Sequence, residues 1–183
     1  MGPRLRGDDS CFRNGHCAVT PYLRAGVIAG IAALVIDQAT KLWLLFVFDI
    51  ARRGAVKVTP FFDLVLAWNV GISFGWFQND SLLAQAMLTA IKAVAVIVLA
   101  IWMARSRNWL ATVALGLIIG GAIGNAVDRV AYGAVVDFAL FHLQIRENTY
   151  NWYVFNLADV AIVAGVTALL YDSFLGVPAA KAP

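Results

Sequence analysis

The chain has 183 residues, of which 61% are hydrophobic and only 14% are charged, and its mean hydropathy is +0.76. A water-soluble domain of this size would need far more polar surface, so the composition indicates a membrane protein in contact with lipid. The net charge of +3 is modest and the basic residues are scattered, which argues against a nucleic-acid-binding surface and predicts no nucleic-acid partner.

Residues 1–24 are predicted to form a polar, disordered tail. They contain the two cysteines of the chain, Cys11 and Cys17, together with His16. These are at most three ligands at an unfamiliar spacing, so we predict neither a disulfide framework nor a metal site, and no cofactor is expected.

Four apolar stretches are long enough to cross about 30 Å of hydrocarbon, which takes roughly 20 helical residues. They cover residues 25–48, 82–104, 109–130 and 152–174. The first is longer than the apolar region of a signal peptide and lacks a convincing small-x-small cleavage site, so we expect it to be retained. The predicted fold is an all-α membrane protein with four transmembrane helices in one domain, residues 25–174, followed by a tail at 175–183.

Basic residues near the ends of the spans predict the topology. With a cytoplasmic N-terminus, seven of them lie inside and five outside, which favours both termini in the cytoplasm. The two outer connections, 49–81 and 131–151, are then the long ones. The stretch AVKVTPFFDLVLAWN in the first connection alternates and is rich in β-branched and aromatic residues, so a small extracytoplasmic hairpin is expected there. Loops of this length usually carry function, and the outer face is therefore the expected working face.

An ionisable side chain inside a bilayer is costly, so each one is a candidate functional residue. Asp37 and Lys41 in the first span are four residues apart and can pair on one helix face, either to stabilise the bundle or to support a site. Lys92 in the second span has no acid one turn away, and it is expected to pair with Asp37 across the bundle or to extend toward the interface.

The third span contains three glycines at four-residue spacing, Gly116, Gly120 and Gly124, which predict a close approach of another helix.

The outer end of the third span carries Asn125, Asp128 and Arg129 on one face. Asp137 would point the opposite way from Asp128 on a continuous helix, but Gly133 offers a break that lets the chain fold back. In the fourth span, Asn156 and Asp159 share one face about seven residues in, roughly 10 Å along the axis.

Asp137 and Asp159 can therefore meet near the outer interface. Two carboxylates in one site of low dielectric constant share a proton, one remaining an acid while the other is a base. The alternative is that both carboxylates cap helices or bond backbone groups.

Four blocks, DQATK, NVGISFG, GNAVDR followed by GAVVDF, and FNLADV, resemble those of the bacterial lipoprotein signal peptidases (signal peptidase II) in order and position, over residues 25–173. The resemblance implies an aspartic endopeptidase of the bacterial inner membrane, expected to be monomeric, with its active site near the outer face. It would act on diacylglyceryl-modified prolipoproteins within membrane lipid and cut before the lipidated cysteine. It implies that Asp137 and Asp159 are catalytic. The substrate-binding or supporting positions that it implies are Asp37, Lys41, Asn69, Gly71, Asn125, Asp128, Arg129 and Asn156, with no metal ligand.

Two other functions fit parts of the sequence. GISFG, residues 71–75, matches the serine-hydrolase string G-x-S-x-G, and Ser73 with His142 is a candidate pair, although the chain has no room for the α/β sheet that this motif requires. A small proton-coupled transporter or an assembly factor would use the intramembrane charges as a relay. Four spans without discontinuous helices make the transporter less attractive, and neither alternative predicts cleavage of a lipidated precursor.

Overall fold

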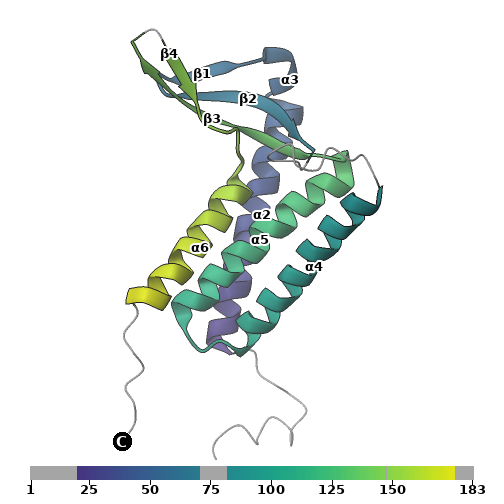
Figure 1. Cartoon of the computed structure of the whole chain (residues 1–183), viewed down its shortest axis with the longest axis vertical. Helices are drawn as coiled ribbons and strands as arrows, with labels where there is room; N and C mark the ends of the chain where they lie inside the picture. Colours follow the sequence, from purple (N-terminus) through teal and green to yellow (C-terminus); the bar gives the residue numbers. More distant parts are fainter. Residues whose placement is uncertain (1–19, 71–81, 147, 176–183) are drawn as a thin grey trace, which may run out of the picture.

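The computed structural model describes residues 20–70, 82–146 and 148–175. The long helices of the described residues stand side by side, and a small sheet covers one end of them (Figure 1). The helices are α2 (Pro21–Leu42, continued by the π-helical turn η1, Trp43–Val47), α4 (Leu82–Arg105), α5 (Trp109–Tyr132) and α6 (Leu157–Leu175); a short helix, α3 (Ile50–Arg53), precedes the sheet. The side chains of α4 before residue 90 lie outside the described part.

Three of these helices, within the described residues, are long and apolar enough to cross a membrane: Pro21–Val47, Trp109–Tyr132 and Leu157–Phe174. Helix α4 forms at the position predicted for a fourth span and is 24 residues long. Its passage through the membrane remains a prediction.

The first span begins four residues earlier than predicted. Pro21 occupies the first turn, and the side chain of Thr20 accepts a hydrogen bond from the backbone N–H of Leu23 at 3.2 Å. A proline in the first turn and a threonine cap are both typical of a helix N-terminus. This start therefore follows from local chemistry rather than from the apolar pattern alone.

The sheet contains β1 (Val56–Thr59), β2 (Phe62–Asn69), β3 (Val135–Ile145) and β4 (Asn148–Asn151), antiparallel and in that order. The predicted hairpin in the first outer connection is confirmed by β1 and β2. The second connection was expected to be a loop, but it contributes the longest strand, β3. Residues 135–139 are all buried, so apart from Asp137 the start of β3 is an apolar run instead of an alternation.

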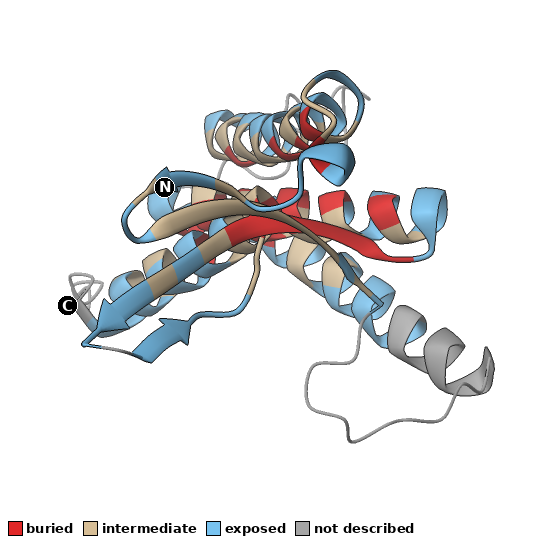
Figure 2. Ribbon diagram, turned by 90° about the horizontal axis from the view of Figure 1, so that it is seen from above, coloured by how far each residue is buried: buried red, intermediate tan, exposed pale blue. Residues whose placement is uncertain are grey.

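Helix α5 lies at the centre of the bundle, between α2 and α6, and carries most of the buried helical residues (Figures 1 and 2). A Cβ atom added at Gly116 or Gly120 would collide with the backbone of Gly26 or Gly30 on α2. The predicted close approach through these two glycines is thus confirmed. It brings the polar residues of α2 next to those at the outer end of α5.

Candidate active site

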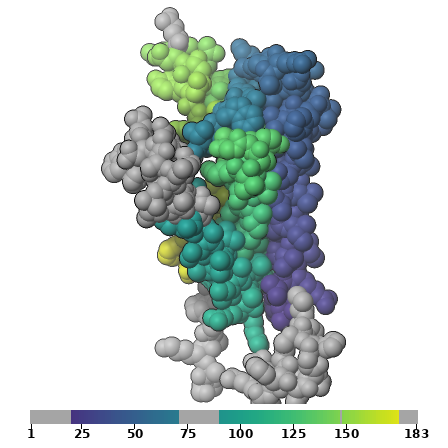
Figure 3. Space-filling view, turned by 90° about the vertical axis from the view of Figure 1, so that its right-hand side faces the viewer, coloured from purple at the N-terminus to yellow at the C-terminus, as the bar shows by residue number. Residues whose placement is uncertain are grey.

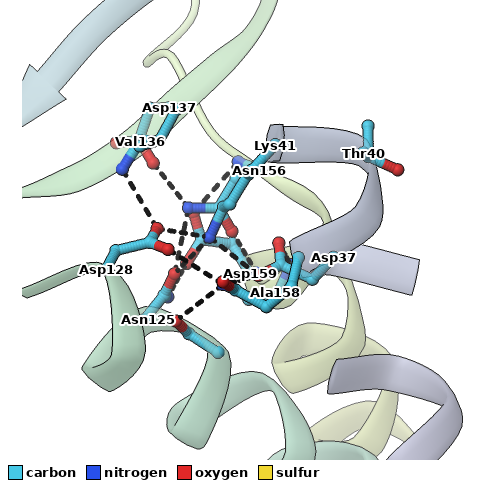
Figure 4. A network of polar contacts seen from close by, with 12 residues as sticks. Asp37, Thr40, Lys41, Asn125, Asp128, Val136, Asp137, Asn156, Ala158 and Asp159 are labelled. Carbon is cyan, nitrogen blue, oxygen red and sulfur yellow. Dashed lines mark hydrogen bonds and ion pairs between the residues drawn. The ribbon is translucent and has the colours of Figure 1, made fainter. Parts of the chain in front are cut away.

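A buried lysine is the charged centre of the polar cluster beneath the sheet (Figure 4). Lys41 Nζ lies 2.8 Å from Asp37 Oδ2 and 2.7 Å from Asp128 Oδ2, and all three residues are at most 1% exposed. The predicted pair of Asp37 with Lys41 is confirmed, and Asp128 on α5 is a second partner. Lys92 does not take that place: it is exposed, and no described residue forms an ion pair with it.

Gln38 was not predicted as a member of this cluster. Its Nε2 lies within hydrogen-bond distance of three acceptors, Asp128 Oδ1 (2.9 Å), the carbonyl of Gly124 (3.1 Å) and Asp37 Oδ2 (3.2 Å). An amide beside a buried acid in an apolar span was the available signal, because such a group needs partners when it is buried. Gln38 connects α2 to α5 at the level of the ion pairs.

Gly133 turns the chain from α5 into β3, as predicted. It has φ of +74°, a left-handed conformation that suits glycine, and its N–H donates to the carbonyl of Arg129 to close the helix. Two residues into the strand, the N–H of Val136 donates to Asp128 Oδ2 at 3.1 Å. This contact ties the start of β3 to the end of α5 and brings Asp137 over the bundle.

Asp137 is 2% exposed and is held by two amides. Asn156 Nδ2 donates to its Oδ1 at 2.6 Å, and Asn69 Nδ2 donates to its Oδ2 at 3.0 Å. Burial raises the pKa of Asp137, and repulsion by Asp159 adds to the rise, whereas the two amides and the more distant charge of Lys41 act against it. The protonated form of Asp137 therefore persists above the pH at which a solvated aspartate ionises.

The position predicted for Asn156 and Asp159 within the fourth span is wrong. Helix α6 begins at Leu157 rather than at 152, because Asn156 caps it: Asn156 Oδ1 accepts from the N–H of Asp159 at 3.0 Å, and Asp159 Oδ2 accepts from the N–H of Asn156 at 3.2 Å. This reciprocal pair is a capping box. Residues 152–156 run toward the sheet instead, where Phe155 bridges to Ala139 of β3.

Asp159 therefore lies in the first turn of α6 instead of 10 Å down its axis. The positive end of the helix dipole favours a negative charge there. One oxygen of Asp159 serves the cap, and the other, Oδ1, accepts from Asn125 Nδ2 at 2.9 Å. The alternative prediction, that this carboxylate caps a helix, thus holds for Oδ2 of Asp159, while Oδ1 faces the polar cluster.

Asn125 joins the ion pairs to the two aspartates. Its Oδ1 accepts from Lys41 Nζ at 3.2 Å and from Asn156 Nδ2 at 3.1 Å. Arg129 lies at the edge of the cluster and donates from Nη1 to the backbone carbonyl of Asn125 at 3.3 Å. Eight of the predicted residues are therefore brought together by direct contacts: Asp37, Lys41, Asn69, Asn125, Asp128, Asp137, Asn156 and Asp159. Gly71 lies outside the described residues.

Asp137 and Asp159 both contact Asn156, the first through the side-chain amide and the second through the cap. Two carboxylates therefore contact one residue; the first has a raised pKa, and the second lies in the first turn of a helix. Such a pair can supply an acid and a base to the same reacting group.

The serine-hydrolase pair finds less support. His142 lies five residues beyond Asp137 on β3, about 16 Å along the strand. Its Nδ1 is 3.6 Å from Asp63 Oδ2, so its charged neighbour is on β2. Ser73 lies outside the described residues.

The tail residues considered as metal ligands, Cys11, His16 and Cys17, also lie outside the described residues. Among the described residues, no group of three or more His, Cys, Asp or Glu side chains is arranged to hold a metal ion.

Known proteins resemble this chain over most of its length. A family model described as signal peptidase (SPase) II matches residues 29–175. A protein of Nitrobacter hamburgensis named lipoprotein signal peptidase is 73% identical over 165 residues, covering 90% of this chain and all of that one. A protein of the same name from Rhodopseudomonas palustris is 68% identical over the same coverage. A solved structure of a bacterial membrane enzyme superposes with a TM-score of 0.70 at 23% identity, covering 87% of this chain and 98% of that one.

Proposed function

We propose that this chain, which belongs to the signal peptidase II family, removes signal peptides from diacylglyceryl-modified prolipoproteins and cuts before the lipidated cysteine. The names of the similar proteins, lipoprotein signal peptidases of related length, support this substrate class. The observation that carries the chemistry is the contact of both Asp137 and Asp159 with Asn156 beneath the sheet.

In the proposed reaction, Asp137 and Asp159 hold one water molecule. The ionised carboxylate removes a proton from the water as its oxygen attacks the scissile carbonyl carbon, and the protonated carboxyl group donates its proton to the carbonyl oxygen. The tetrahedral intermediate then breaks its C–N bond. The new amine takes the proton that the base received, the former carbonyl oxygen returns its proton to the other aspartate, and the pair regains its starting state.

The neighbouring amides orient the two acids. Asn69 and Asn156 each donate to a different oxygen of Asp137, and Asn125 donates to Asp159. Asn125 is itself fixed by Lys41, whose charge is balanced by Asp37 and Asp128. We therefore assign the ion pairs a positioning role, since they hold the amide that holds Asp159. Arg129 is proposed to contact the substrate at the edge of this cluster.

The proposed membrane placement has four spans, both termini in the cytoplasm and the sheet outside, in the bacterial inner membrane. The turn between α4 and α5 lies at the end of the bundle opposite the sheet (Figure 1). Its sequence contains Arg105 and Arg107, which agrees with a cytoplasmic turn. The site beneath the sheet is then near the outer interface. A substrate tethered by its acyl chains presents its scissile bond at that level, and tethering favours attack by orienting the peptide. The proposed enzyme is a monomer.

Cleavage of a diacylglycerylated precursor by the purified protein in detergent tests the proposal. Asp137→Asn and Asp159→Asn should each lower kcat by about a thousandfold or more while the protein still inserts, because the reaction needs both groups. Asp49→Asn is the matched control: Asp49 lies on the surface before α3, and its left-handed backbone, with φ of 52°, accommodates asparagine. Normal turnover by either site variant would remove that residue from the mechanism.

A further inference from the structure

The hairpin of β3 and β4 carries a groove that the proposed reaction does not use. Its volume is about 420 Å³, which is within the range of ligand-binding pockets. In the space-filling view, the hairpin stands at the end of the molecule farthest from the turn between α4 and α5 (Figure 3). The groove is lined mainly by aromatic residues, with two polar ones among them: Phe61, Phe141, His142, Tyr150, Asn151 and Trp152.

Phe141 and His142 are fixed by contacts with the rest of the sheet. Phe141 lies opposite Phe62 of β2, with ring centroids 5.1 Å apart, and it stacks on Phe155 at 5.6 Å. The backbone N–H of His142 donates to the carbonyl of Phe61 at 3.0 Å. These contacts hold the groove open in the absence of an occupant, as expected of a binding site that is largely formed in advance.

The remaining aromatic residues of the groove are exposed. Phe61, Tyr150 and Trp152 are 54%, 59% and 68% accessible. A contiguous group of large apolar residues on a surface is typical of an interaction site. Tyrosine and tryptophan are also enriched among the residues that contribute most to protein and peptide binding. This part of the hairpin is therefore suited to an occupant that covers the rings.

The groove lies on the strand that carries Asp137. Phe141 follows Asp137 by four residues, about 13 Å along β3. The other wall of the groove is β4, an edge strand of the sheet that the described residues form, and all of its residues are exposed. An edge strand can pair with an extended peptide through the backbone, while adjacent pockets take the side chains. An open edge beside an aromatic groove suits a peptide better than an acyl chain, which has no group to pair with the backbone.

The proposed cut determines which part of the substrate can reach this groove. The signal peptide is on the membrane side of the cut, and the mature segment leads out of the membrane. The hairpin extends away from the helices, on the same outer side as the mature segment (Figure 1). At about 3.3 Å per residue, an extended segment that starts beside Asp137 covers about 13 Å in roughly four residues. With the lipidated cysteine as the first residue, about the fifth residue of the mature segment arrives at the groove.

We propose that the groove of the β3–β4 hairpin binds the mature segment of the precursor, with an apolar or aromatic side chain near its fifth residue packed against Tyr150 and Trp152. The inference rests on the proposed function and adds a peptide-binding subsite to it. The subsite is remote from the scissile bond, so it contributes equally to binding of the substrate and of the transition state. Such a contribution lowers KM and leaves kcat unchanged.

Cleavage of two diacylglycerylated precursors by the purified full-length protein tests this subsite. Both have the same signal peptide; the longer has about ten mature residues with phenylalanine as the fifth, and the shorter ends after the third. Trp152→Ala should raise KM for the longer precursor by about threefold to tenfold, the loss expected for one aromatic contact, and leave kcat unchanged. It should change neither constant for the shorter precursor, and Trp152→Phe should retain most of the binding.

The variants should fold like the wild type. Trp152 is largely exposed, and its bond to the carbonyl of Phe141, at 2.7 Å, comes from the backbone N–H, so the unfolding midpoint should not change. Phe174→Ala is the matched control, because Phe174 is an exposed aromatic residue near the end of α6 that lies away from the sheet. It should leave KM unchanged for both precursors.

A photo-crosslink gives a readout that needs no turnover. In the Asp137→Asn variant, a precursor with benzoylphenylalanine as its fifth mature residue should cross-link to β4 or to Trp152. Cross-links confined to other segments would overturn the proposal, as would an unchanged KM of Trp152→Ala for the longer precursor. An equal rise in KM for both precursors would assign the groove to the membrane surface instead. If the wild type cleaves neither precursor, the proposed function itself fails; if it cleaves both and Trp152→Ala behaves identically, the subsite alone fails.

Discussion

Replacing Lys41 with methionine should destabilise the protein strongly. The change keeps most of the length of the unbranched side chain but removes the charge that balances Asp37 and Asp128, two carboxylates that are fully buried. Each ion pair at about 2.8 Å is worth roughly 6 kcal/mol of attraction at an effective dielectric constant of about 20. Several kcal/mol are recovered because the ammonium no longer has to be desolvated, and removal of one partner of a buried pair typically costs about 3 to 5 kcal/mol in total.

Thermal unfolding in detergent, followed by circular dichroism, measures this effect. A loss of 3 to 5 kcal/mol lowers the midpoint by about 6 to 20 °C in a chain of this size. The double variant Asp37→Asn/Lys41→Met should unfold at a higher temperature than Lys41→Met alone, because it leaves only one unbalanced carboxylate. Lys57→Met, on the exposed strand β1, should stay within about 0.5 kcal/mol of the wild type. A wild-type midpoint for Lys41→Met, or a double variant less stable than the single one, would refute the electrostatic explanation.

Three further changes test the site and its scaffold. Asn69→Ala removes an amide that stabilises the charged form of Asp137, so it should raise the pKa of Asp137 further. The limb of the pH–rate profile that Asp137 controls should then move to higher pH. A limb that stays in place or moves to lower pH contradicts this role of Asn69. Gly133→Ala places a side chain at φ of +74° with open space around it, so it should cost about 1 to 2 kcal/mol of thermal stability through backbone strain alone. Gly120→Val should lower the unfolding midpoint more than Gly133→Ala does, since its Cβ would meet the backbone of Gly30 and separate α2 from α5.

The parts of the fold that the sequence predicts well are those set by a single local pattern. The long apolar runs predict the helices, the alternation around Pro60 predicts the hairpin of β1 and β2, and the spacing of Asp37 and Lys41 predicts their contact. The contact of Lys41 with Asp128 joins two helices, and helical spacing carries no information about which residue of another helix will be opposite. The family blocks place these residues in one site, but they do not indicate which atom contacts which.

Strand β3 and the start of α6 were missed for one physical reason. Apart from Asp137, the buried half of β3 is apolar on both faces, so it has no alternation to distinguish it from a loop or a helix segment. Residues 152–155 are apolar as well and read as the beginning of a span, although they run toward the sheet and pair there through Phe155. In both segments the tertiary contacts, rather than the local pattern, determine the structure.

Asn156 shows why the helix boundary and the site belong together. A helix cap needs only a side-chain acceptor, which serine, threonine, aspartate and asparagine all provide. At position 156 the acceptor caps α6, while the amide nitrogen of the same side chain lies within hydrogen-bond distance of Asp137 and Asn125. Aspartate would keep the cap but place a third carboxylate beside two others, and serine would be too short to reach Asp137. Only an amide of this length caps the helix and also donates to the buried acid, so the residue that caps α6 is the one that sets the position of Asp137 relative to Asp159.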